Sequence, residues 1–307
     1  MRVVVTGAAG FIGSHLVDAL LAEPCNSVVA FDNLRRGALA HLAQHEADPR
    51  LSVVIADVAD RRAVAEALAG TELVYHLAAQ SNVMGAVADP RYSFEANVAG
   101  SFNVLEAAAS AGVRRVVFTS SREVYGDAAN LPVDESQPVA PRNPYGASKA
   151  AAELYCDIFW RRFGLDVAVV RLANVYGPRD RDRVIPLWLE CAAAGQPLDV
   201  FGGDQVIDFV PVPLAVEALL RVSTILLDGL PINVGSGTGT PLLALARRIL
   251  DLHGGRGELR MLPARDAEVR HFVADVGRMR ELLKIEPPAD PLCDLPALLQ
   301  PVATGSS

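Results

Sequence analysis

The sequence is poor in lysine, in aromatic residues and in long apolar runs. Only Lys149 and Lys284 are lysines among its 28 basic residues, and the formal net charge is −8. An acidic chain with a pI near 5.3 is unsuited to bind nucleic acid or an anionic membrane surface, so we expect neither partner. Residues 229–246 have no charged residue, but Pro231, Asn233 and several glycines interrupt them, which argues against a membrane span.

Cysteine is also scarce, and its spacing is uninformative. The four cysteines lack the paired spacing that a disulfide framework or a zinc site needs, so we expect reduced thiols and no metal. Because no signal peptide precedes the first apolar run, we expect a cytoplasmic location. The 307 residues are enough to bury a large core in one or two domains.

One of the two lysines, Lys149, lies four residues after Tyr145. Random placement of the tyrosines and lysines would yield about 0.04 such pairs, so the spacing is informative. Residues four apart share one face of a helix, where an ammonium can lie beside a phenol and favour its phenolate. The pair therefore predicts a tyrosine that acts as a general base near neutral pH.

The amino terminus has the order strand, glycine-rich loop, helix. Gly7 permits a tight turn, Gly10 lets the backbone approach a pyrophosphate, and Gly13 lets the helix pack on the strand. The amino terminus of the helix then faces the anion. The sequence thus predicts a dinucleotide site.

A second strand, Val28–Phe31, leads to Asp32 about twenty residues after the loop. A carboxylate at that place accepts the ribose hydroxyls of NAD and repels the additional phosphate of NADP. Arg35 and Arg36 lie close enough to weaken this preference, and the sequence favours NAD.

Strand and helix patterns alternate through the first half of the chain. Further strands are predicted at Leu51–Ile55, Glu72–His76, Arg115–Thr119 and Leu165–Arg171, and helices at Arg61–Leu68, about Tyr92–Ser110 and Pro144–Phe163. This alternation predicts an α/β fold with a Rossmann-type, doubly wound parallel sheet. Residues 1–173 plus about 209–235 would form the NAD-binding domain. Residues about 174–208 plus 236–307 would form a smaller, interleaved substrate lobe, in which the glycine cluster 235–239 is a structural turn.

Together these motifs resemble the extended short-chain dehydrogenase/reductases that act on nucleotide-diphosphate sugars, over almost the whole chain. Further matching segments are Asp32-Asn33, Asp57-Val58, His76–Ala79, Asn97, Ser120–Gly126, Asn174–Arg179 and Asn233–Gly237. The resemblance implies a homodimer formed through the helices near residues 92–110 and 144–163. It also implies that NAD is bound by Gly7, Gly10, Phe11, Ile12, Gly13, Asp32, Asn33, Asp57, Val58, Leu77, Ala78, Ala79, Asn97, Tyr145 and Lys149.

The resemblance implies that Ser121, Tyr145 and Lys149 are the catalytic residues. The Tyr145 phenolate would remove a proton from O4 of the sugar while a hydride passes to NAD. Lys149 would tune that phenol and anchor the ribose, and Ser121 would hold the sugar oxygen. The favoured interpretation is an NAD-dependent UDP-sugar 4-epimerase with a transient 4-keto intermediate. It would convert UDP-glucuronate to UDP-galacturonate, or UDP-glucose to UDP-galactose.

Glu123 keeps two lyase alternatives open, a nucleotide-sugar 4,6-dehydratase and a UDP-glucuronate decarboxylase. Dehydratases of GDP-mannose and those decarboxylases have a glutamate at this place. Arg122 stands where the glucose-type dehydratases have an aspartate acid, and a guanidinium cannot donate a proton near neutral pH. Glu123 could equally be a structural carboxylate paired with Arg122.

Several residues are expected to bind the nucleotide sugar by this resemblance. Arg179 matches a segment that faces the sugar in 4-epimerases of uronic acids, whereas we expect Arg181 and Arg183 to be solvated loop charges. Ile207 stands where the family usually has an arginine that binds the diphosphate. The expected substrate contacts are Ser121, Arg122, Glu123, Asn174, Arg179, Val184, Phe201 and Arg265.

Overall fold

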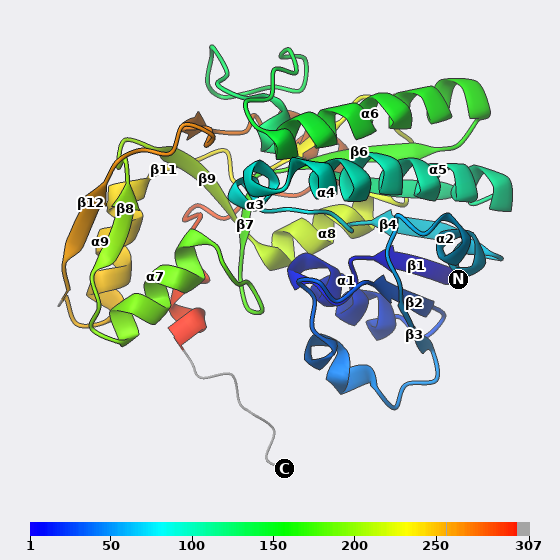
Figure 1. Ribbon diagram of the computed structural model, residues 1–307, viewed down its shortest axis with the longest axis horizontal. Helices are drawn as coiled ribbons and strands as arrows, with labels where there is room; N and C mark the ends of the chain where they lie inside the picture. The colour runs from blue at the N-terminus through cyan, green and yellow to red at the C-terminus, as the bar shows by residue number, and fades with distance from the viewer. Residues whose placement is uncertain (256, 300–307) are drawn as a thin grey trace.

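A seven-stranded parallel sheet forms the larger lobe of the computed structural model, which describes residues 1–255 and 257–299 (Figure 1). The strand order is β10-β6-β5-β4-β1-β2-β3. The strands are β1 (Arg2–Thr6), β2 (Ser27–Asp32), β3 (Leu51–Ile55), β4 (Leu73–His76), β5 (Arg115–Ser121), β6 (Val167–Leu172) and β10 (Ile232–Val234). The order reverses between β1 and β4, which is the point where open α/β sheets bind ligands.

Helices cover both faces of this sheet, because its central strands are apolar on both sides. Val3 and Val5 of β1 face α1 (Phe11–Ala22) and α8 (Val212–Val222), whereas Val4 faces the helices on the other side. That side is formed by α2 (Arg61–Leu68), α5 (Gly100–Ala111) and α6 (Pro144–Phe163). Shorter helical segments are η1 (Leu39–His45), α3 (Val83–Ala88), α4 (Pro90–Phe94), η2 (Glu95–Ala99), η3 (Arg122–Val124) and η4 (Met279–Leu283).

The smaller lobe has its own apolar core. It contains β7 (Asn174–Tyr176), α7 (Val184–Ala193), β8 (Leu198–Phe201), β9 (Val206–Pro211), β11 (Gly239–Pro241), α9 (Leu242–Leu252), β12 (Leu259–Leu262), β13 (His271–Phe272) and η5 (Leu295–Leu299). Buried Asp208 of β9 accepts hydrogen bonds from the backbone N–H groups of Ser236 (2.8 Å) and Gly237 (3.1 Å). These bonds confirm the prediction that this glycine cluster is a structural turn.

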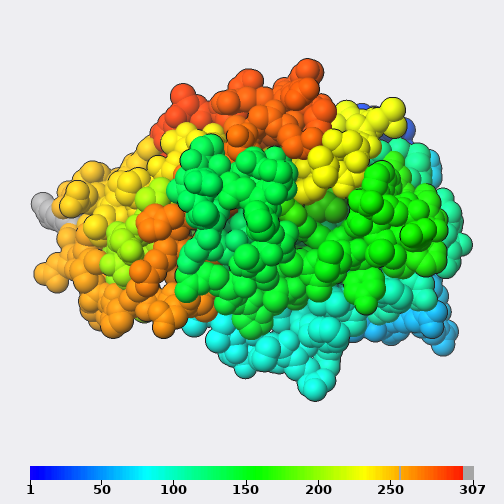
Figure 2. Space-filling view, turned by 90° about the horizontal axis from the view of Figure 1, so that it is seen from above, coloured from blue at the N-terminus to red at the C-terminus, as the bar shows by residue number. Residues whose placement is uncertain are grey.

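The two lobes are joined by side-chain packing and by backbone hydrogen bonds, in addition to the segments of chain that pass between them. Val269, Phe272 and Met279 pack in the same core as β1 and α1, although the predicted domain division assigns them to the substrate lobe. The loop of residues 126–143, in the middle of the face that Figure 2 shows, is also tied to the carboxyl-terminal part. Its Val133 donates an N–H bond to the Val273 carbonyl at 2.7 Å.

Most predicted elements have the expected place. The strand Leu51–Ile55 and the helices Arg61–Leu68 and Pro144–Phe163 have the predicted bounds. The single helix predicted over about 92–110 is instead divided by the π-helical turn η2, in which buried Asn97 bonds to Gln80 and Ser148. The four cysteines have free thiols. Within the described residues, no helix combines the length and the apolar character that crossing a membrane requires.

Candidate active site

A cavity of about 1020 Å³ lies between the two lobes. The glycine-rich loop, the carboxyl ends of β2, β4 and β5, and parts of β7, α7, β8 and β9 line it. It contains every residue that the sequence predicts to contact cofactor or substrate, with the exception of Asn97. Asn97 lies behind the wall, where its Oδ1 accepts the N–H of Gln80 at 2.7 Å and its Nδ2 donates to Ser148 at 2.8 Å.

The glycine-rich loop has no room for a side chain at Gly7 or Gly13. Gly7 has φ +72°, and a Cβ there would lie 2.8 Å from the backbone nitrogen of Ala78. A Cβ at Gly13 would collide with the Gly7 carbonyl oxygen. The loop leads directly into α1, whose first N–H groups point toward a bound anion. This geometry fits the pyrophosphate of NAD.

Asp32 is the acidic group beside that loop. Its carboxylate accepts backbone N–H bonds from Ala9 (2.9 Å) and Leu34 (2.8 Å), while burial raises its pKa above the usual value. Arg35 lies over the Tyr92 ring at 3.6 Å, and Arg36 donates to Ser81 at 2.9 Å. Since both arginines are engaged elsewhere, Asp32 is positioned to receive ribose hydroxyls, as NAD requires.

Helix α6 brings Tyr145 and Lys149 into the cavity. Asn143 caps the helix by accepting the N–H of Gly146 at 2.8 Å. One turn further, the Lys149 ammonium donates to the Thr119 carbonyl at 2.7 Å. Burial lowers the pKa of Lys149 to about 8. An ammonium has three N–H donors, so two remain for a ligand.

The phenol of Tyr145 is tuned differently from the prediction. The sequence predicts a pKa lowered by Lys149, whereas burial raises the pKa of Tyr145 above its usual value. A hydrogen bond with Ser121 opposes this rise most, followed by the positive charge of Arg183. Arg122 also lowers the pKa of Tyr145, and Glu123 raises it. The arginines are therefore tuning charges that the Tyr/Lys spacing does not reveal.

Glu123 is held from two sides. Its Oε1 lies 2.9 Å from Nη2 of Arg122, and its Oε2 accepts a bond from Asn143 at 2.8 Å. All three residues are at least nine-tenths buried. Glu123 also donates its backbone N–H to Ser121 Oγ at 3.2 Å. The carboxylate thus fixes both the adjacent guanidinium and the amino-terminal cap of α6.

At the opposite end of the cavity, an arginine stacks on an aromatic ring. The guanidinium of Arg265 lies 3.6 Å from the ring centre of Phe201, and it pairs with Glu268 at 3.1 Å. Ile207 lines the same region, where the family usually has a cation. Arg265 thus places a cation at this end of the cavity, which it lines as the sequence predicts.

Arg179 and Arg183, in the segment after β7, line the cavity. Arg179, predicted to face the sugar, also pairs with Asp18 of α1 at 2.9 Å. Arg183, predicted to be a solvated charge, lines the cavity with its guanidinium 5.5 Å from the ring centre of Phe11. The sequence signal that could have identified Arg183 is its position directly before the apolar helix α7, which lines the cavity.

Comparisons with known proteins agree with this geometry. The model of the NAD dependent epimerase/dehydratase family matches residues 3–235. The chain belongs to this family. A UDP-glucose 4-epimerase of Mycolicibacterium smegmatis is 38% identical over 294 residues, which are 94% of each chain.

Two solved structures of the family are similar over nearly the whole chain. A dTDP-glucose 4,6-dehydratase from Streptomyces venezuelae, solved with NAD, has a TM-score of 0.93 and 33% identity, and the match covers 97% of this chain and 96% of that one. A UDP-glucose 4-epimerase from Thermotoga maritima, solved with UDP-glucose, has a TM-score of 0.91 and 31% identity, with 97% of both chains covered. The family member described here is an NAD-dependent α/β enzyme of nucleotide-sugar chemistry.

Proposed function

We propose that the protein is an NAD-dependent UDP-sugar 4-epimerase that interconverts UDP-glucose and UDP-galactose through a transient 4-keto sugar. The observation that carries the proposal is the convergence of Ser121, Tyr145 and Lys149 on one cavity with the glycine-rich loop. The cavity is at the upper end of the size range of ligand pockets, which suits two large ligands bound together. The similarity to a UDP-glucose 4-epimerase supports the same assignment.

In the proposed reaction, Tyr145 exchanges a proton with O4 of the sugar, and Ser121 holds the same oxygen. Lys149, fixed by the Thr119 carbonyl, would donate its remaining N–H groups to the nicotinamide ribose. Bound NAD would supply the hydride acceptor at C4, and its positive ring would favour the phenolate. Burial of Tyr145 and Lys149 keeps bulk water away from the proton that moves.

The pairing of the arginines favours a neutral hexose over a uronate. Arg122 is paired with Glu123. Arg179 is paired with Asp18, and Arg183 lies 3.5 Å from Asp180. At buried Arg122, a uronate carboxylate would lie close to the Glu123 carboxylate, and two like charges in one buried site repel each other. UDP-glucuronate is therefore the second substrate to test.

The alternative is a lyase that uses Glu123. The similarity to a dTDP-glucose 4,6-dehydratase supports this alternative. A lyase needs a free group to remove the C5 proton. Glu123 already accepts charge-assisted contacts on both oxygens, and protonation would break one of them. The contacts of Glu123 thus support the epimerase.

The test is product analysis in D₂O without added NAD. An epimerase converts UDP-glucose to UDP-galactose and leaves C5 free of solvent deuterium. A lyase releases a 4-keto-6-deoxy sugar with deuterium at C5, or carbon dioxide from UDP-glucuronate, and either product would replace our proposal. Tyr145→Phe should lower kcat by on the order of 10³-fold, because the proton acceptor is lost. We also expect a higher kcat/KM for UDP-glucose than for UDP-glucuronate.

A further inference from the structure

Residues 177–183, between β7 and α7, form a segment that lines the dinucleotide cavity. In Figure 1 this green segment passes beside α1. Arg179 and Asp182 have left-handed backbone angles, with φ +65° and φ +59°. Such angles are uncommon outside glycine and persist only where the surroundings hold them. The contacts of this segment explain what holds it.

One edge of the segment is attached to α1 at three successive places. The Pro178 carbonyl lies 3.0 Å from Nε2 of His15. Nη1 of Arg179 lies 2.9 Å from Oδ2 of Asp18, as a charge pair without the alignment of a hydrogen bond. The contact of Arg183 with Phe11 then reaches the first residue of the helix, next to the glycine-rich loop.

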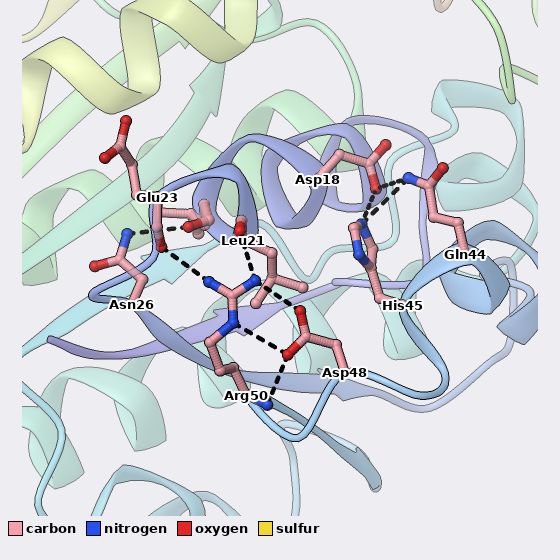
Figure 3. Close-up of polar contacts among 9 residues, drawn as sticks. Asp18, Leu21, Glu23, Asn26, Gln44, His45, Asp48 and Arg50 are labelled. Atoms are coloured by element: carbon pink, nitrogen blue, oxygen red, sulfur yellow. Dashed lines mark hydrogen bonds and ion pairs between the residues drawn. The ribbon is translucent and has the colours of Figure 1, made fainter.

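Asp18 is tied to a further element. Its Oδ1 accepts a bond from Gln44 at 2.5 Å and lies 2.9 Å from Nε2 of His45 (Figure 3). Gln44 and His45 both belong to the last turn of η1. Asp18 therefore connects residues 177–183 with α1 and with η1, and its side chain is three-quarters buried.

The other edge of the segment reaches across the cavity. Asp182 lies 3.6 Å from Arg36, which follows the strand that ends at Asp32. Arg36 in turn donates to Ser81 at 2.9 Å, from the segment after β4. Loops that follow three different strands of the structure are thus linked around the same cavity.

We propose that residues 177–183 are a strap that retains bound NAD, and that the Asp18–Arg179 pair is its latch. A dinucleotide that lies between the glycine-rich loop and the strap can leave only when these contacts part, so the latch should slow release. The proposal concerns the cofactor and holds whichever sugar is turned over. An epimerase that regenerates NAD in every cycle has no need to exchange it.

The test is the rate at which NAD leaves the NAD-loaded protein, measured by trapping released NAD with excess alcohol dehydrogenase and ethanol. We expect Asp18→Asn and Arg179→Gln each to accelerate release on the order of 5-fold, the effect of losing one partly exposed ion pair. The double variant should release NAD no faster than the faster single variant, because both changes open one contact.

A matched control is Asp48→Asn; Figure 3 shows Asp48 together with Arg50 and the contacts of Asp18. Asp48 pairs with Arg50 at 2.7 Å, and Arg50 donates to the Leu21 carbonyl at the end of the same helix α1, outside the cavity. Unchanged NAD release in both strap variants would overturn the proposal, and so would an equal acceleration in Asp48→Asn. A protein that fails to epimerise UDP-glucose but shows the expected release rates would refute the proposed function alone.

Discussion

The proton affinity of Tyr145 is set by groups from three separate segments. Its own helix supplies the phenol, β5 supplies Ser121, and the chain before α7 supplies Arg183. Because burial disfavours the phenolate, these partners decide how far the pKa rises. The structure thus distributes over several residues a task that the Tyr/Lys spacing assigns to Lys149 alone.

Removal of the Arg183 charge should move the pH dependence of catalysis. In Arg183→Gln the pKa of Tyr145 rises further, because a positive charge that lowers it is lost. The reaction needs the phenolate as base, so the acid limb of the kcat profile should shift to higher pH, with lower activity below it. Arg181→Gln, an exposed neighbour in the same segment, should leave the profile unchanged. A shift of equal size in that control would contradict the argument.

Glu123→Gln distinguishes a holding role from a catalytic one. If Glu123 only positions Arg122 and Asn143, epimerisation of UDP-glucose should fall about 10-fold or less, since one charged contact is lost. A catalytic acid or base would instead cost on the order of 10²–10⁴-fold. The measurement is kcat at saturating UDP-glucose, and a loss in the larger range would assign Glu123 a catalytic role.

At the scale of elements, α6 serves both stability and the site. Its capping residue Asn143 accepts the N–H of Gly146 and donates to Glu123 and to the Ala267 carbonyl at 3.0 Å. One side chain therefore joins the start of the helix, the segment after β5 and the substrate lobe. Loss of the cap should affect catalysis as well as folding.

Asn143→Ala tests this double role against the cap of α2, Asp60, which accepts the N–H groups of Arg62 and Ala63 and is not among the residues that line the cavity. Each alanine variant should lose about 1 kcal/mol of unfolding free energy, or more at the buried Asn143. Only Asn143→Ala should also lower kcat/KM. Chemical denaturation and initial rates measure the two effects, and equal kinetics in both variants would limit Asn143 to a structural role.

At the scale of the whole molecule, an apolar patch lies on the outer side of α5 and α6, which run side by side in Figure 1. Leu154 is 70% exposed and Phe163 is 64% exposed. Phe102 and Tyr155 pack edge to face with ring centres 5.3 Å apart. Exposed apolar clusters of this kind mark association surfaces, so the patch supports the predicted homodimer.

Leu154→Arg should convert the predicted dimer into a monomer of 32.6 kDa, because the new charge would be buried in the predicted contact. Sedimentation at micromolar concentration measures the mass. Leu226→Arg, at a residue that is 93% exposed and outside these helices, is the control and should remain dimeric. A wild-type protein that sediments as a monomer would refute the predicted dimer.

The local sequence determined most elements of the larger lobe and predicted the glycine-rich loop beside Asp32. The β-branched run before Gly7, the glycine spacing and the acid at Asp32 are short-range features, since each depends on the conformation of neighbouring residues or on a single strand-to-helix turn. The bounds of α6 and the Tyr145–Lys149 face follow in the same way from helical periodicity. These predictions therefore needed no knowledge of distant contacts.

The tertiary structure alone decided which charges meet. Arg179 pairs with Asp18 of α1 at the cavity edge, and Arg183 lines the cavity beside Phe11. Asn97 lies behind the cavity wall because a π-helical turn directs it toward Gln80. Such pairs join residues far apart in the chain. The sequence spacing of long charged side chains does not indicate which residues they will pair with. Coulombic and burial effects depend on these distances in space, which only the folded chain defines.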